Sequence, residues 1–286
     1  MLYAPRCLWF PSLVCCEANS WTTKSIAAFA MGRNSLISFR LMQRFSVLSY
    51  NIHECVGSDR CRNPARIAEV IKQSGAQIIG LQEVRSDSCG IDELHQMNYL
   101  AAATGFKAIP GPAVERSNGH FGNVLLTSYK IRHVRNLNLT YRRCEPRGAI
   151  DADLEIGGEI VRVIVTHLGL LPVERRFQVK KLLLALAEER SRIVILISDF
   201  NEWLPTGRSL RWIHSRLGKT ALVRTFPSAF PIFALDRIWG SPPASLARIS
   251  CLRNPLARMA SDHLPLKAVI EPPPPPHPTD RSCGKI

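Results

Sequence analysis

The stretch IVILISDFN, residues 193–201, is a run of five aliphatic residues that ends in polar side chains. Short runs of β-branched and aliphatic residues are typical of buried strands. The same pattern recurs along the chain, and each time a polar residue or pair follows a short apolar run. Polar residues at the ends of such strands can converge on one edge of a folded sheet. The other ends of this kind are residues 48–51, 78–83, 161–167 and 261–263.

The polar residues at these ends are a mixture of hard oxygen ligands and imidazoles, a set that suits a Mg²⁺ or Mn²⁺ site acting on a phosphate ester. Two of them, Asp199 and Asn201, are two positions apart, so both side chains would face the same way in an extended backbone. An Asx-turn is the structural alternative for this pair. The full set is Asn51, Glu83, His167, Asp199, Asn201, Asp262 and His263.

Composition indicates a globular protein with a substantial core and an anionic partner. The 286 residues carry a formal net charge of +14, and no apolar run reaches the roughly 20 residues that span a bilayer. Residues 1–44 contribute +4 and residues 271–286 contribute nothing net, so +10 belongs to residues 45–270. A basic face that is merely solvated is the simpler alternative.

The chain divides into three parts. Residues 1–44 are expected to be a disordered extension, from a translation start placed too early (with Met31 or Met42 as the initiator) or from a transit peptide. Residues 45–270 form the domain, and residues 271–286 are a Pro-rich tail. The nine cysteines show no CxxC pair, which favours reduced thiols and a reducing, cytoplasmic location. We expect a monomer without stable membrane insertion.

Hydrophobic periodicity predicts strands mixed with helices and hairpins. We expect helices at 64–74, 91–104, 173–190 and 209–217, the third with Phe177, Leu182, Leu183, Leu184 and Leu186 inside. The fold class is therefore α+β, with sheets flanked by helices. The expected strands are residues 45–51, 77–81, 123–128, 150–156, 160–167, 193–198, 235–239 and 264–270.

Seven short motifs occur in an order that resembles the endonuclease/exonuclease/phosphatase superfamily, which has the DNase I-like fold. The resemblance covers about residues 45–270 and looks closest to small bacterial members of unassigned substrate. It implies a four-layer α/β/β/α sandwich of two mixed sheets. One departure is Ser198, where most relatives have Gly. The motifs are LSYN (48–51), LQEV (81–84), GNVLL (122–126), VTHL (165–168), SDFN (198–201), TFP with LDRI (225–227 and 235–238) and SDHLP (261–265).

The resemblance also assigns metal and substrate roles to individual residues. Glu83 would be the principal ligand of Mg²⁺, for which Mn²⁺ can substitute, with Asn51 and Asp262 in the metal shell. Arg147 would meet phosphate oxygens with its guanidinium fork, although Arg142 and Arg143 lie close in sequence. Asn123 would also bind substrate.

The catalytic roles follow from the same resemblance. Asp199, positioned with Asn201, would orient and deprotonate the attacking water. His263 would be coupled to Asp236, since a carboxylate at one imidazole nitrogen sets the tautomer and raises the basicity of the ring. His167 would contact the scissile phosphate. His53, Glu54 and Asp59 are treated as loop residues.

Two substrate classes are compatible with the sequence. We expect a nuclease (endo- or exonuclease) acting on nucleic acid, which the basic charge favours. The alternative is a lipid or small-molecule phosphoester, which the short segment between Glu83 and Asn123 favours. Trp203 is the one conspicuous aromatic residue near the motifs. A third hypothesis is that the protein is not an enzyme but a module that binds anions through its basic surface.

Overall fold

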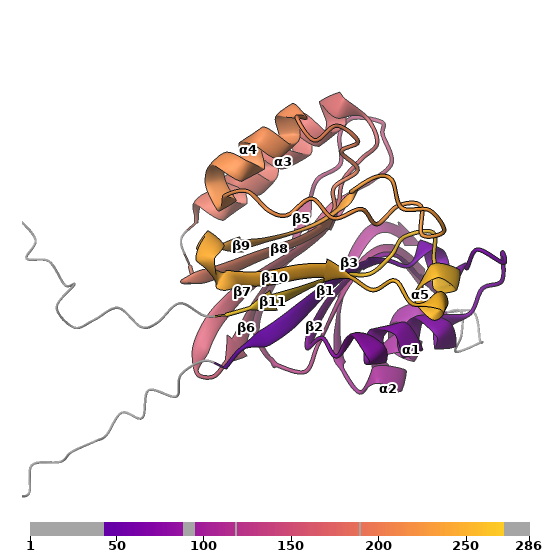
Figure 1. The fold of residues 1–286 in the computed structure, drawn as a ribbon. Coiled ribbons are helices and arrows are strands. Elements are labelled where there is room, and N and C mark those ends of the chain that lie inside the picture. The colour runs from indigo at the N-terminus through magenta and orange to yellow at the C-terminus, as the bar shows by residue number, and fades with distance from the viewer. Residues whose placement is uncertain (1–42, 88–94, 118, 189, 272–286) are drawn as a thin grey trace, which may run out of the picture. The chain divides into compact units, whose positions relative to one another are not determined.

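The computed structural model describes residues 43–87, 95–117, 119–188 and 190–271 (Figure 1). The predicted extension at residues 1–44 and the Pro-rich tail at 271–286 lie almost wholly outside the described residues, as do residues 91–94 of the predicted second helix. The domain boundaries therefore stay predictions.

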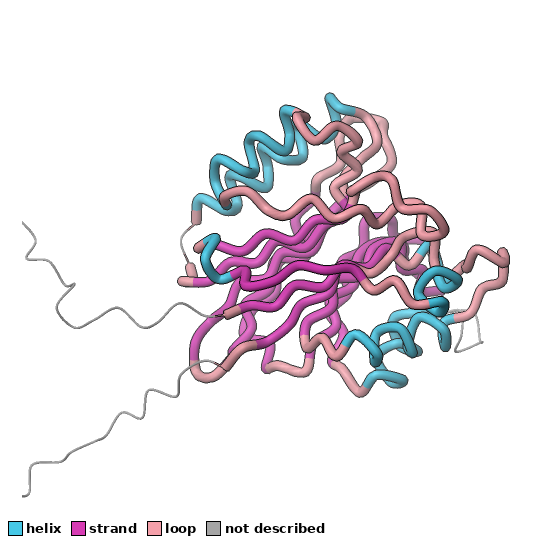
Figure 2. The backbone as a smooth tube through the Cα atoms, in the orientation of Figure 1, coloured by secondary structure: helices cyan, strands magenta, loops and turns pink. Residues whose placement is uncertain are grey.

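Two mixed β-sheets form the centre of the domain (Figure 2). The first sheet has the order β10-β11-β1-β2-β4-β3, and the second has the order β5-β6-β7-β8-β9. In each sheet one inner pair is parallel, β1 with β2 and β7 with β8, while the other neighbours are antiparallel. The strands are β1 (Phe45–Asn51), β2 (Ile78–Asp87), β3 (Lys107–Arg116), β4 (Gly119–Thr127), β5 (Lys130–Asn138), β6 (Gly148–Ile156), β7 (Glu159–His167), β8 (Ile193–Asp199), β9 (Asp236–Ser241), β10 (Leu246–Cys251) and β11 (Leu266–Ile270).

Helices cover the outer face of each sheet, so the predicted four-layer sandwich is confirmed (Figure 1). Helices α1, α2 and α5 pack on the first sheet, and α3 and α4 pack on the second. Among the described residues, no helix is long and apolar enough to cross a membrane. The α-helices are α1 (Pro64–Ser74), α2 (Gln96–Thr104), α3 (Pro172–Ala187), α4 (Arg208–Leu217) and α5 (Pro255–Ala260); short 3₁₀ turns occur at η1 (His53–Cys55) and η3 (Pro243–Ser245).

The central core lies between the two sheets, and strand alternation explains how it forms. Successive side chains of a strand point to opposite faces, so Val47 joins the core between the sheets while Leu48 packs under the helices. The sheets approach closely at Gly80 of β2. A Cβ atom there would lie 2.7 Å from Ile197 Cγ2 and 3.0 Å from Val165 Cγ1, so only glycine fits without a shift.

Three edge strands and one helix were not predicted. Strand β3 contains Pro110 and Pro112, and proline argues against a strand except at a sheet edge, where β3 lies. Strand β5 is also an edge strand and is largely exposed, so it lacks a clear apolar run. The missed elements are β3, β5, β10 and α5.

Three details of predicted elements were wrong. Helix α3 ends at Ala187, and the prediction that the whole run Leu182–Leu184 faces inside fails for Leu184, which is 72% exposed. The reason is helical geometry, because three consecutive residues span most of a turn and cannot share one face. Strand β2 does not end at Leu81 but continues to Asp87.

Candidate active site

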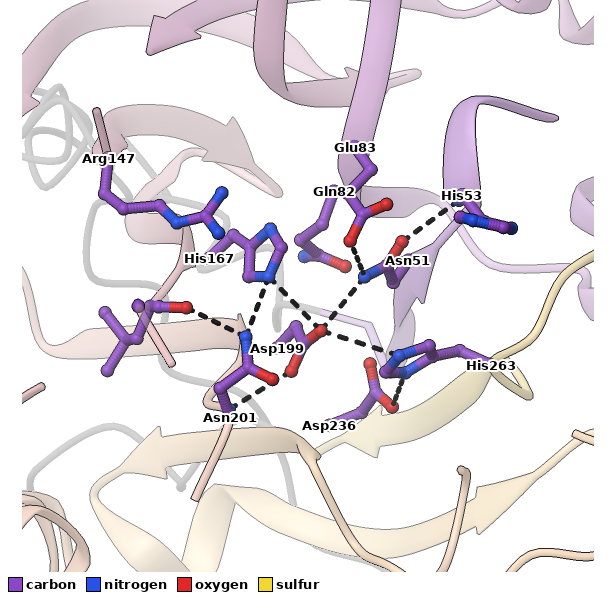
Figure 3. Close-up of polar contacts among 12 residues, drawn as sticks. Asn51, His53, Gln82, Glu83, Arg147, His167, Asp199, Asn201, Asp236 and His263 are labelled. Carbon is purple, nitrogen blue, oxygen red and sulfur yellow. Dashed lines mark hydrogen bonds and ion pairs between the residues drawn. The ribbon is translucent and has the colours of Figure 1, made fainter. Parts of the chain in front are cut away.

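The carboxyl ends of the two parallel strand pairs carry most of the predicted site. In the first sheet Asn51 lies opposite Gln82, and in the second sheet His167 lies opposite Asp199. Asp199 is in turn paired with Asp236 at the start of β9. The two sheets therefore contribute side chains to one cluster, which Figure 3 shows converging on Asp199. Ser198 in place of glycine leaves this register intact, since it pairs with Thr166 and Arg237.

Glu83 reaches the site from a bulge inside β2. The register of β2 against β4 shifts between Leu81 and Val84, and Glu83 has a left-handed backbone with φ 57°. A bulge redirects a side chain, and bulges often occur beside active sites. The Glu83 carboxylate accepts a hydrogen bond from Asn51 Nδ2 at 2.8 Å.

Asn51 connects the two sheets through its amide. Its Nδ2 also donates to Asp199 Oδ2 at 3.0 Å, and its Oδ1 accepts from the backbone N–H of His53 at 3.0 Å. Ser261 Oγ donates to the Asn51 carbonyl at 2.8 Å, which ties the SDHLP motif to the end of β1. Asn51 is thus fully engaged, and in this arrangement it orients two carboxylates.

Asp199 and Asn201 do not share an extended backbone. Asn201 has φ 50°, and its N–H donates to Asp199 Oδ1 at 3.2 Å, so the pair forms an Asx-type turn. The turn nevertheless directs Asn201 into the cluster, where Nδ2 donates to His167 Nε2 and to the Leu168 carbonyl, each at 2.9 Å. Because His167 Nε2 accepts, the proton of its neutral ring lies on Nδ1.

His263 and Asp236 form the predicted imidazole–carboxylate couple. His263 Nδ1 lies 2.8 Å from Asp236 Oδ2, and Thr225 Oγ1 donates to the same oxygen at 2.5 Å. The other ring nitrogen, Nε2, is 3.7 Å from Asp199 Oδ2. Phe226 packs against the imidazole with ring centroids 4.7 Å apart.

The predicted substrate-binding residues lie where the two sheets meet. Arg147 is buried, with Nη2 donating to Glu145 and Nε without a partner among the described residues, while Arg142 and Arg143 are exposed. Asn123 of β4 donates to the Gly148 carbonyl at 3.0 Å. Figure 3 places Arg147 beside His167.

The electrostatics of the cluster shift the pKa values of His167 and His263 in opposite directions. Burial, reinforced by the charge of Arg147, lowers the pKa of His167 to about 3, so its ring is neutral. Burial also disfavours the cation at His263, but Asp236 and Asp199 outweigh it and raise its pKa to about 10. Burial together with the charges of Asp199 and Asp262 raises the pKa of Glu83, although its hydrogen bond from Asn51 acts in the opposite direction.

The donor set fits a divalent cation. Glu83, Asp199 and Asp262 are close enough for their charges to disfavour ionisation of Glu83, and a bound cation would relieve this repulsion. Asp199, Asp236 and His263 also place one ligand atom each within 4.8 Å of one another. Without a metal, Asp236 and Asp199 keep His263 protonated, and the imidazole would have to lose that proton to ligate a metal. The carboxylates near Glu83 and the group of Asp199, Asp236 and His263 are both candidate metal sites.

One buried ion pair behind the site was not predicted. Arg175 of α3 contacts Glu202 through two atom pairs, Nε to Oε2 at 3.3 Å and Nη2 to Oε1 at 3.2 Å. Its Nη1 donates to the carbonyls of Gly169 and Leu170. Arg175 thus connects the loop after His167 to the loop after Asn201. The sequence contains a signal for this pair, because Arg175 lies at helical spacing with Val179, Leu182 and Leu186, which form the buried face of α3. A charged residue on a buried face needs a partner.

We expect Arg175→Met to destabilise the protein by about 3–5 kcal/mol, because it removes the two contacts through which a guanidinium neutralises the buried carboxylate of Glu202. The double variant Arg175→Met/Glu202→Met should recover much of that loss, since no buried charge is left unpaired. Urea denaturation measures both free energies of unfolding. If the double variant is as unstable as the single one, the pair does not act through charge compensation.

Comparison with known proteins identifies the family of the chain. Residues 48–263 match the model of the Endonuclease/Exonuclease/phosphatase family. The uncharacterized protein YbhP of Escherichia coli strain K12 is 30% identical over 253 residues, which cover 79% of this chain and 96% of that protein.

Two solved structures share the fold. The mannosyl-6-phosphatase Bt3783 of Bacteroides thetaiotaomicron VPI-5482 is 21% identical, with a TM-score of 0.64 over 79% of this chain and all of that chain (100%). D. rerio TDP2, in complex with a single-strand DNA product, is 17% identical, with a TM-score of 0.58 over 80% of this chain and 100% of that chain. The chain belongs to the endonuclease/exonuclease/phosphatase family, whose members are hydrolases that act on phosphoesters and generally use divalent metals.

Proposed function

We propose that this protein hydrolyses a phosphodiester with the help of Mg²⁺ or Mn²⁺. The observation that carries the proposal is the environment of Asp199. Its carboxylate contacts Asn51 from the first sheet and the backbone of Asn201, and the imidazoles of His167 and His263 lie 3.5 and 3.7 Å from Oδ2. A carboxylate held in this way can orient a water molecule and accept its proton.

The surrounding residues would bind the phosphate. The His263 cation would donate to the phosphate from Nε2 and the neutral His167 from Nδ1, and Arg147 would supply a second positive charge. Donors fixed in advance stabilise charge that develops in the transition state. Asp236, with Thr225, holds the His263 ring in place and keeps it protonated.

Glu83 would hold the metal, with Asp262 and Asn51 next to it. When bound, a divalent ion supplies Lewis-acid stabilisation of the phosphoryl oxygens. The bulge in β2 is what directs the Glu83 carboxylate toward this position.

Two substrate classes remain candidates. Nucleic acid is supported by the net charge of +14 and by the likeness in fold to a protein solved with a DNA product. A phosphodiester at a lipid surface is supported by exposed apolar side chains beside the site, described below.

Hydrolysis of bis(p-nitrophenyl) phosphate should require Mg²⁺ or Mn²⁺, because the site collects carboxylates without enough positive charge to offset them. Chelation with EDTA should remove the activity and added Mg²⁺ should restore it. Glu83→Gln should raise the metal concentration for half-maximal activity by about tenfold or more. The matched control is Glu115→Gln, an exposed carboxylate on β3. Full activity in EDTA would contradict the metal requirement.

A further inference from the structure

The segment between the catalytic motifs SDFN and SDHLP has a strongly one-sided charge. From Glu202 to Ala260 the sequence has nine Arg and Lys residues and two acids, and both acids are buried and paired, Glu202 with Arg175 and Asp236 with His263. This segment alone therefore carries a formal +7 of the total +14. A field of one sign beside an active site attracts an anionic partner.

The same segment exposes large apolar side chains next to the site. Phe230 is 75% exposed, Leu204 is 65% exposed, and Ile232 and Trp203 are more than two-fifths exposed. Met259 of α5 is similarly exposed. Exposed apolar groups that cluster at one place indicate an interaction surface. We call Trp203, Leu204, Phe230, Ile232 and Met259 the docking face.

Internal contacts bring together the chain segments that carry these residues. The Trp203 ring lies 4.7 Å from the Phe233 ring and 6.0 Å from the Phe226 ring, and Phe226 packs against the catalytic His263. Arg258, next to Met259, donates to the carbonyls of Ser228 and Ala229. Figure 1 shows the segment between α4 and β9 reaching across to α5.

The loop 226–233 presents its apolar tip on a fixed backbone. Phe233 N–H donates to the Phe226 carbonyl at 2.8 Å, and Phe230 N–H donates to the Pro227 carbonyl at 3.1 Å. Ser228 Oγ contacts the Ser261 carbonyl at 2.7 Å, which fastens the loop to the SDHLP motif. These hydrogen bonds fix the backbone of the loop 226–233, so Phe230 and Ile232 are held in their exposed positions.

We infer that the docking face binds an anionic membrane surface, with Phe230 and Ile232 entering the apolar boundary and the neighbouring arginines meeting lipid phosphates. This combination of apolar and basic side chains is that of peripheral membrane-binding surfaces. Leu204, Ile232 and Met259 are aliphatic and cannot stack on bases, which favours lipid over nucleic acid. It follows, resting on the proposed function, that the phosphodiester belongs to a lipid headgroup.

Co-sedimentation of the full chain with vesicles tests the inference. We expect binding to phosphatidylcholine vesicles that contain phosphatidylglycerol, and weak binding to phosphatidylcholine alone. The double variant Phe230→Ser/Ile232→Ser should weaken binding by about tenfold or more, because two apolar side chains no longer leave water. The matched control is Leu184→Ser, an equally exposed apolar residue on α3.

Arg224→Glu tests the electrostatic part. Arg224 is exposed and lies two residues before the loop 226–233, and its variant should bind vesicles less tightly and with a weaker dependence on salt. Lys72→Glu is the control, since Lys72 is exposed at the last turn of α1, beside the opposite ends of the strands.

Several results would overturn the inference: no binding to the anionic vesicles, equal binding by the Phe230→Ser/Ile232→Ser variant, or an effect of that variant on binding of a single-stranded oligonucleotide but not of vesicles. An assay of bis(p-nitrophenyl) phosphate hydrolysis distinguishes a failure of the membrane-docking inference from a failure of the proposed function. Activity on that water-soluble diester without vesicle binding refutes only the docking face. Vesicle binding without any hydrolysis refutes the proposed function and leaves the docking face standing.

Discussion

Asp199→Asn should lower the rate of phosphodiester hydrolysis by about 10²–10⁴-fold, the usual loss for a general acid–base group. Asparagine keeps the shape of the side chain and can still accept the hydrogen bond from Asn51, but it cannot take a proton from water. His263→Gln and Asn201→Ala should cause losses of similar size. Steady-state rates with bis(p-nitrophenyl) phosphate and Mg²⁺ measure these effects.

Combined variants provide a stricter test. Asp199→Asn/His263→Gln should lose little more than the worse single variant, because residues that act as a unit are not additive. Asp59→Asn, a loop carboxylate bound to Arg66, serves as the control with unchanged activity. Losses that simply multiply would show that Asp199 and His263 act independently.

The stability of the metal-free protein should be greatest near pH 6.5 and fall on both sides. Below pH 6.5, His167 is protonated in the unfolded chain but stays neutral in the folded chain until about pH 3. The free energy of unfolding therefore decreases as the pH falls. Above 6.5, the folded chain holds a proton on His263 up to about pH 10 that the unfolded chain releases, so stability falls as the pH rises. Each pKa unit corresponds to about 1.36 kcal/mol, which makes both effects several kcal/mol.

Urea denaturation in EDTA across this pH range measures the two limbs. His263→Gln should flatten the alkaline limb, and His167→Gln should flatten the part of the acid limb between pH 6.5 and 3. His133→Gln is the control, since that imidazole is exposed on β5. An alkaline limb that persists in His263→Gln would mean that the Asp236 couple does not set it.

The parts of the site that the sequence predicted are those with a local signature. Asn51, His167 and Asp199 each end an apolar run, and the rule that parallel strands end at the same edge places Asn51 beside Gln82 and His167 beside Asp199. The packing of the two sheets then brings Asn51 to Asp199. The α+β sandwich follows from the same runs, because each inner strand is apolar enough to be recognised. Whether these residues have the metal and catalytic roles assigned to them stays a prediction.

The parts that were missed depend on contacts distant in sequence. The bulge at Glu83 is a shift of register against β4, and no residue of β2 signals it. Arg175 and Glu202 are 27 positions apart, and only the packing of α3 against the second sheet makes them partners. The orientation of the Asn51 amide likewise depends on carboxylates that two different strands deliver.

The close approach of the sheets at Gly80 makes the geometry of the site depend on a residue that belongs to none of the polar motifs. Gly80 lies three residues before Glu83, while Val165 and Ile197, which fill the space beside it, each lie two residues before His167 and Asp199. The candidate site residues of the two sheets therefore face each other across the packing contact between the sheets. A single methyl group at Gly80 would push the two sheets apart and separate the site residues of one sheet from those of the other. Every polar motif of the sequence would be unchanged. Inspection of the motifs alone would then mistake an inactive protein for a working one.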